Sequence, residues 1–225
     1  MRLSSVAIAW CLAGTPALAL VSEPPSRVVD RAVAWVDGRV ITLSELELEA
    51  RVALVQAGGV QAASAPLDDT ALRHALDLAI GQRLEEREAD KLQAYPLDEA
   101  EVEAALRAFR ARFPAPRDYE QFLARHEADG PQLEAIFRRA LRTAKVLDGK
   151  LRLKAQVSEV EVRRAYEREA AALGSARYEE LRGPLRQKLV ADRMKSLAAA
   201  ELTQVRHGAD VRLIAPFARE PKAPR

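Results

Sequence analysis

Two short apolar runs within residues 32–41 flank the dipeptide Asp37-Gly38. Asp-Gly suits a two-residue hairpin turn, because both positions of that turn need a positive φ. Directly afterwards, the Thr42 side chain can accept from the Glu45 N–H while the Glu45 carboxylate reaches back to the Thr42 N–H. The stretch therefore predicts a β-hairpin followed by a capped helix. Because a two-stranded hairpin is marginal in water, we expect a third strand from elsewhere in the chain.

Apolar residues recur every three to four positions along most of the remaining chain, which is typical of amphipathic helices. Helices are expected at residues 43–57, 69–92, 98–113, 118–129, 132–153, 158–170 and 178–206. The first helix is expected to have one apolar face, which consists of Leu46, Ala50, Ala53 and Leu54. The charged run 85–91 predicts that the second helix ends at the surface. The last helix is expected to bury six apolar side chains, those of Leu181, Leu185, Leu189, Met194, Leu197 and Leu202.

The ends of the chain complete the expected domain organisation. Residues 210–214 alternate in polarity and have strand character, so they supply the missing third strand. If that strand pairs with the hairpin, residues 31–214 form one mainly α domain, with an N-terminal part at 31–170 and a C-terminal helix and strand at 176–214. Proline-containing segments without periodicity predict a flexible lead at 20–30 and a flexible tail at 215–225.

The first nineteen residues have the features of a cleavable secretory signal peptide. Arg2 begins a short basic start, an apolar run covers 6–13, and Ala17-Leu18-Ala19 is a small-x-small cleavage pattern. Residues 14–16, Gly-Thr-Pro, interrupt the apolar run well short of the roughly 20 residues that a membrane-spanning helix needs. We therefore expect export with removal of residues 1–19, and no stable membrane insertion. Removal of this segment also removes Cys11, the one cysteine, so no disulfide is expected.

Composition narrows the classes of function. The 225 residues include 35 Lys+Arg and 33 Asp+Glu, and residues of both signs alternate along the chain. A broad positively charged surface that binds nucleic acid is therefore not expected. The sequence has no glycine-rich phosphate loop, no Cys/His metal cluster and no nucleophile motif. The sequence therefore predicts neither an enzyme nor a cofactor or metal. This prediction rests only on the absence of those motifs.

Aromatic residues gather between positions 109 and 137, on helices joined by short loops. They are Phe109, Phe113, Tyr119, Phe122 and Phe137. One interpretation is an ordinary core. The other is an apolar groove for extended or unfolded peptide, because short helices that do not cover one another leave such grooves. These five residues are the candidate peptide-groove residues of the sequence.

Several stretches, taken in order, resemble one known family. Residues 27–46 look like the opening of the SurA N-terminal chaperone domain, and 70–74 with the following helix are similar to its second helix. Residues 136–162 continue the resemblance through its last N-terminal helices. Residues 178–214 look like the helix and strand with which SurA-type and PrsA-type proteins finish. The resemblance implies a SurA-like peptide-binding domain, in which a small N-terminal β-hairpin is joined by a C-terminal strand.

The sequence departs from that family at one place. The parvulin prolyl-isomerase domains of the family normally precede the final helix, whereas here only residues 170–177 remain, too few for any domain. The resemblance therefore implies an ATP-independent periplasmic holdase for unfolded polypeptides, with outer-membrane proteins as clients by analogy, and without isomerase activity. The alternative is an envelope scaffold or interaction subunit that binds one folded partner.

Overall fold

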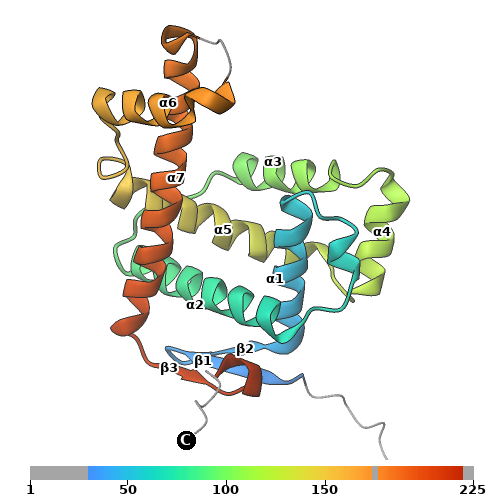
Figure 1. The fold of residues 1–225 in the computed structure, drawn as a ribbon. Coiled ribbons are helices and arrows are strands. Elements are labelled where there is room, and N and C mark those ends of the chain that lie inside the picture. The colour runs from blue at the N-terminus through green and yellow to red at the C-terminus, as the bar shows by residue number, and fades with distance from the viewer. Residues whose placement is uncertain (1–29, 174–176, 220–225) are drawn as a thin grey trace, which may run out of the picture.

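The computed structural model describes residues 30–173 and 177–219, so the expected signal peptide, most of the lead and the end of the tail lie outside the described residues. Seven helices and a small sheet make up this part of the chain (Figure 1). In chain order the elements are β1 (Ala32–Val36), β2 (Arg39–Thr42), α1 (Leu43–Gln56), η1 (Ala62–Ser64), α2 (Asp69–Lys91), α3 (Glu99–Arg110), α4 (Pro116–Arg125), α5 (Gly130–Leu151), α6 (Glu159–Leu173), α7 (Tyr178–His207), β3 (Val211–Leu213) and η2 (Pro216–Ala218). The predicted mainly α class is confirmed.

The predicted hairpin and helix start are present, with one correction. Asp37 and Gly38 have φ values of 46° and 90°, as a two-residue turn between β1 and β2 requires. The Thr42 hydroxyl accepts from the Glu45 N–H at 3.4 Å. The reciprocal half of the predicted capping box is wrong, because the Glu45 carboxylate accepts instead from the charged guanidinium of Arg83 at 2.5 Å.

The predicted third strand is also confirmed, and it comes from the far end of the chain. The sheet is antiparallel in the order β2-β1-β3, and Val36 is paired with Val211. The Asp37 N–H donates to the Asp210 carbonyl at 3.0 Å, and the Ile214 N–H donates to the Val33 carbonyl at 2.9 Å. The two ends of the described chain therefore meet in one sheet (Figure 1).

The start of the predicted flexible tail is ordered, which corrects that expectation for residues 215–219. Ala215 and Ala218 are only 2% and 7% exposed, and Phe217 packs against the same core. The Arg73 Nε donates to the Phe217 carbonyl at 2.9 Å, which joins η2 to α2. Apolar side chains hold this segment, whereas residues 220–225 lie outside the described residues.

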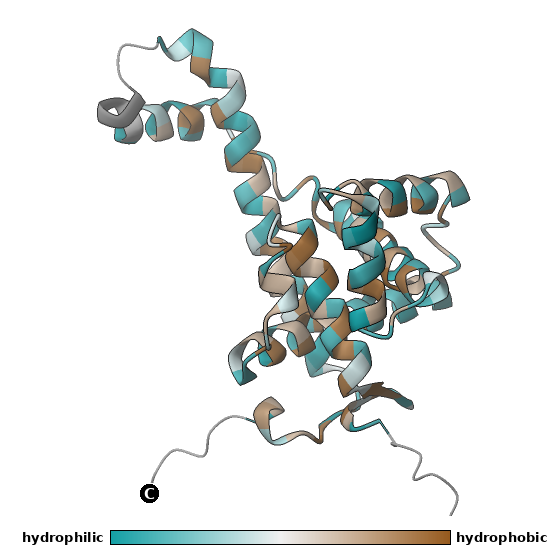
Figure 2. Ribbon diagram, turned by 90° about the vertical axis from the view of Figure 1, so that its right-hand side faces the viewer, coloured by the Kyte–Doolittle hydropathy of each residue, from teal (hydrophilic) through white to brown (hydrophobic). Residues whose placement is uncertain are grey.

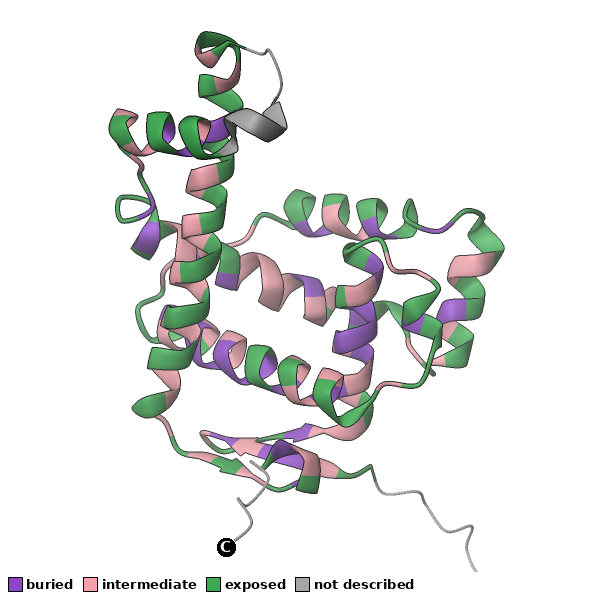
Figure 3. Ribbon diagram, viewed as in Figure 1, coloured by how far each residue is buried: buried purple, intermediate pink, exposed green. Residues whose placement is uncertain are grey.

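Two hydrophobic cores fill the body of the molecule (Figure 3). The first lies between the sheet, α2 and η2, and the second lies between α1, η1, α3, α4 and α5. One face of the charged end of α2 lies on the surface as predicted, with Arg87, Asp90 and Lys91 exposed, whereas the other face is buried, with Glu85 0% and Ala89 1% exposed. The second face is buried because α5 and α7 both pack against α2, and Lys150 of α5 neutralises Glu85 there.

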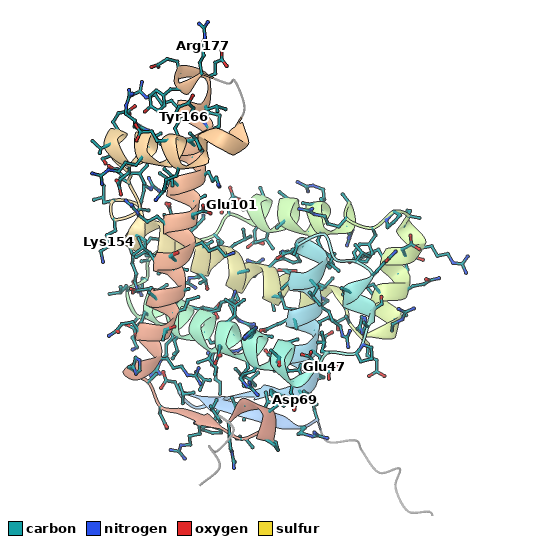
Figure 4. All side chains as sticks on the ribbon, in the orientation of Figure 1. Glu47, Asp69, Glu101, Lys154, Tyr166 and Arg177 are labelled. Atoms are coloured by element: carbon teal, nitrogen blue, oxygen red, sulfur yellow. The ribbon has the colours of Figure 1, made fainter. Side chains whose placement is uncertain are left out.

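The long helix α7 is less buried than its pattern predicts. Of the six apolar residues expected inside, only Leu185 is buried, and the others are half-exposed. The lower half of α7 packs on α2, while its upper half pairs with α6 to form an arm that stands away from the body (Figures 1 and 2). Tyr166 and Arg177 both lie on this arm (Figure 4). The prediction failed because α7 packs against α6 in the arm and against α2 and α5 below it, instead of lying inside a surrounding core.

A glycine permits the close approach of α7 to α2. A Cβ added at Gly81 would lie 2.9 Å from the Cβ of Leu202. We expect Gly81→Ala to lower the free energy of unfolding by about 1–3 kcal/mol, because the clash outweighs the gain in helix propensity. Gly208→Ala is the control, since Gly208 has a φ of −96° and nothing within 4 Å of the added Cβ. Urea denaturation measures both variants, and equal stabilities would contradict the tight packing.

Candidate functional site

The structure brings all five candidate groove residues together. The Phe109 ring centroid lies 5.5 Å from Phe113, 6.3 Å from Tyr119, 5.9 Å from Phe122 and 5.4 Å from Phe137, each in an edge-to-face arrangement. The four phenylalanines are at most 7% exposed, and only Tyr119 is half-buried. The groove interpretation is therefore wrong for this cluster, which is the second core. It failed because α1 and η1, far away in sequence, also pack on these rings.

A hollow surface lies next to that core, along α5. It consists of two cavities of about 460 and 110 Å³ that share one lining residue, Ile136. We call this surface the furrow. Its polar end is lined by Ser44, Glu45, His126, Gln132 and Arg139, and its apolar end by Ala50, Ala53, Leu78 and Ala140. From Gln132 to Ala140 the helix rises about 12 Å, which matches about four residues of extended chain.

Hydrogen bonds and charges fix the polar end of the furrow. Burial favours a higher pKa for Asp30, but hydrogen bonds from Ser44 and Thr42 outweigh it and hold the pKa below its usual range. The Nε2 atom of His126 is buried without a hydrogen-bond partner. Burial, together with the positive charges of Arg51 and Arg125, lowers the pKa of His126. The lowered pKa favours the neutral form of the imidazole.

Four charged side chains join the three helices that form the walls of the furrow. Arg83 of α2 donates to Glu45 at 2.5 Å and to Glu49 at 2.7 Å, and Arg139 of α5 also donates to Glu49. Burial alone favours a lower pKa for Arg83, but its hydrogen bonds to Glu49 and Glu45 raise it above the usual range. These partly buried ion pairs fix α1 against α2 and α5, so the furrow is preformed.

The apolar end of the furrow is made mainly of alanines. Ala53, expected on the core face of its helix, is exposed here, and α1 instead buries Val52 and Val55. Leu78 is 43% exposed at the edge of this end. Gln56 and Gln82 also line it, and their amides can both donate to and accept from a peptide backbone. This end therefore offers apolar contact and backbone hydrogen bonding together.

Sequence reasoning missed the furrow because each of its signals has a more common interpretation. Alanines on a helix face are typical of a core, and Glu45 with Glu49 resembles an exposed charged face. The signal that could have found it is a set of small residues, Ala50, Ala53 and Ala140, on helices that must pack together.

In comparisons with known proteins, neither a family model nor a curated protein matches the chain. Within residues 30–173 and 177–219, no group of three or more His, Cys, Asp or Glu side chains is placed to hold a metal ion. Among the described helices, none is at once long and apolar enough to cross a membrane.

Proposed function

We propose that this protein is an ATP-independent holdase of the SurA type, which binds short segments of unfolded polypeptide in the furrow. The furrow is the observation that carries the proposal. Its alanine-lined end can receive small and medium apolar side chains, while Gln56 and Gln82 can satisfy the backbone of the same segment. An unfolded chain presents both groups at once, so the surface fits extended polypeptide better than it fits a folded partner.

The size of the furrow suits reversible binding. Contact with about four extended residues buries much less area than a stable protein interface, which buries about 1,200–2,000 Å². Such a site binds one segment weakly and releases it without an energy source. Apolar contact also makes binding tolerant of sequence, as a holdase with many clients requires.

Support for a periplasmic location comes from the sequence. The signal-peptide features of residues 1–19 and the SurA-like order of the elements both favour export to the envelope. Outer-membrane proteins are proposed as clients by that analogy alone. The chain between the end of α6 at Leu173 and the start of α7 at Tyr178 is too short for an isomerase domain, so the proposed activity includes no prolyl isomerisation.

A light-scattering experiment tests the proposal. An outer-membrane protein unfolded in urea is diluted into buffer with a severalfold excess of the protein lacking residues 1–19. We expect suppressed scattering that persists at high salt, because screening weakens only the charged contribution to binding. Unchanged aggregation of the client would contradict the proposal. A pull-down that returns one folded protein at fixed stoichiometry would favour an envelope scaffold instead.

A further inference from the structure

Strand β3 forms one edge of the sheet, since the order β2-β1-β3 leaves no described strand beyond it (Figure 1). The Asp210 carbonyl and the Ile214 N–H are both hydrogen-bonded on the side of β1. Because alternate residues of a strand turn their backbone groups to opposite sides, Val211 and Leu213 turn theirs away from β1. The Val211 N–H donates to the Ala209 carbonyl at 3.1 Å. The Val211 carbonyl and both backbone groups of Leu213 have no hydrogen-bond partner among the described residues.

A hollow of about 590 Å³ lies beside this edge, between β3, η2, α2 and α7. This volume is within the range of about 300–1,000 Å³ that is typical of ligand pockets. Val211 and Leu213 line the hollow with their side chains, which also pack against the first core, and Ala209 and Ala218 add small apolar groups. A strand placed alongside β3 would therefore point the side chains of one of its faces into the hollow.

The two arginines that line the hollow already have partners. Arg206 of α7 forms an ion pair with Asp77 of α2 at 2.5 Å. The Arg73 Nε donates to the Phe217 carbonyl at 2.9 Å. The hollow therefore offers apolar contact between fixed walls, and no arginine in it is left to attract an anion.

The opposite edge of the sheet, formed by β2, has no comparable hollow. The cavity beside β2 measures about 200 Å³, and charged residues make up most of its lining. They are Asp37, Arg39, Arg83, Glu86, Arg87 and Asp90. An apolar side chain in that cavity would displace water from these charged groups, which is unfavourable. Only the edge at β3 combines unpaired backbone groups with room for apolar side chains.

We propose that the outer edge of β3 binds an extended polypeptide segment, which adds to the sheet as a fourth, antiparallel strand. A residue opposite Leu213 can exchange two backbone hydrogen bonds with it, and the residue two positions along can donate to the Val211 carbonyl. These two residues of the segment also point their side chains into the hollow. The edge therefore selects a segment in which every second residue is apolar. The hollow shares no lining residue with the furrow, and the inference does not depend on the furrow.

Two N-methylated peptides test the inference on the unaltered protein lacking residues 1–19. Fluorescence anisotropy first measures the binding of a labelled peptide of about eight residues in which valine and threonine alternate. Methylation of the valine amides removes the hydrogen bonds donated to β3, so the dissociation constant is expected to rise about tenfold or more. Methylation of the threonine amides adds as many methyl groups on the opposite side of the peptide. This change is expected to alter binding by less than about twofold.

A pair of proline variants tests the same edge from the side of the protein. Leu213→Pro removes the N–H that points away from β1 and is expected to weaken peptide binding about fivefold or more. Val40→Pro is the matched control on β2. Arg39 pairs with Val36 beside the two-residue turn, so Val40 also turns its backbone away from β1, but at the opposite edge. Binding by this variant is expected to match that of the wild type, and thermal melts check that both variants are folded.

Four results would overturn the inference. The first two are absence of binding up to about 1 mM peptide and equal affinities of the two methylated peptides. The third is binding that Ala53→Trp removes and Leu213→Pro leaves unchanged, which would place the peptide in the furrow and support the proposed holdase site alone. The fourth is a dimer in analytical ultracentrifugation that Leu213→Pro dissociates, which would assign the edge to a second copy of this chain.

Discussion

A chain that ends at Ala209 is expected to lose more than about 4 kcal/mol of its free energy of unfolding, a large share of the 5–15 kcal/mol typical of a domain. The truncation removes β3 and η2, and with them the partly buried side chains of Val211, Leu213 and Phe217. Burial of each such side chain contributes about 1.5–3 kcal/mol when complete. The hydrogen bonds between β1 and β3 are lost as well. Urea denaturation followed by circular dichroism measures the change.

Two further truncations serve as matched controls. A chain that ends at Arg219 keeps every described contact of η2 and should be as stable as the full chain. A chain that ends at Ala215 loses Phe217, Ala218 and the hydrogen bond from Arg73, so an intermediate loss is expected. Equal stability of all three truncated chains would show that the sheet does not hold the two ends together.

Lys150→Met is expected to lower the free energy of unfolding by about 2–4 kcal/mol, because it leaves the buried carboxylate of Glu85 without its cation. The Lys150 Nζ donates to the two Glu85 oxygens at 3.0 and 2.8 Å and to Glu201 at 3.0 Å. Burial favours a lower pKa for Lys150, but these hydrogen bonds outweigh it and raise the pKa above its usual range. The expected loss in free energy of unfolding allows for solvent screening, since the Lys150 side chain is 36% exposed.

Lys145→Met is the matched control for this prediction. Lys145 lies on the same helix, is also 36% exposed and binds Glu101, a carboxylate that is 43% exposed against 0% for Glu85. Its loss should cost less than about 1 kcal/mol, as for other surface pairs. The double variant Glu85→Leu, Lys150→Met should recover much of the stability. Equal losses from the two lysine variants would contradict a special role for the buried carboxylate.

Local signals in the sequence predicted the parts of this fold that local chemistry determines. Asp37-Gly38 predicted the turn, and the helices expected from residues 98 and 158 begin at Glu99 and Glu159. The alternation at 210–214 predicted the third strand. Each of these signals depends on residues within a few positions of one another, so the tertiary structure did not override them.

Features that depend on which helices cover one another could not be predicted. The charged end of α2 suggested a surface, but Lys150 lies 65 positions away from Glu85, and no local pattern shows that they meet. The aromatic residues were correctly expected to cluster, whereas their burial depends on α1 and η1. Ala53 illustrates the reverse case, since its apolar position suggested the core and the structure exposes it in the furrow.

Photo-crosslinking tests the central claim, that unfolded polypeptide binds in the furrow, most directly. A benzophenone-bearing residue replaces Ala53, which is exposed in the apolar end of the furrow, or Ala104, which is also exposed but lies on α3 outside the furrow. Each protein is irradiated with an outer-membrane protein freshly diluted from urea. If unfolded polypeptide binds in the furrow, cross-linking to the client is strong from position 53 and weak from position 104. Equal cross-linking at both positions, or cross-linking from position 104 alone, would contradict it.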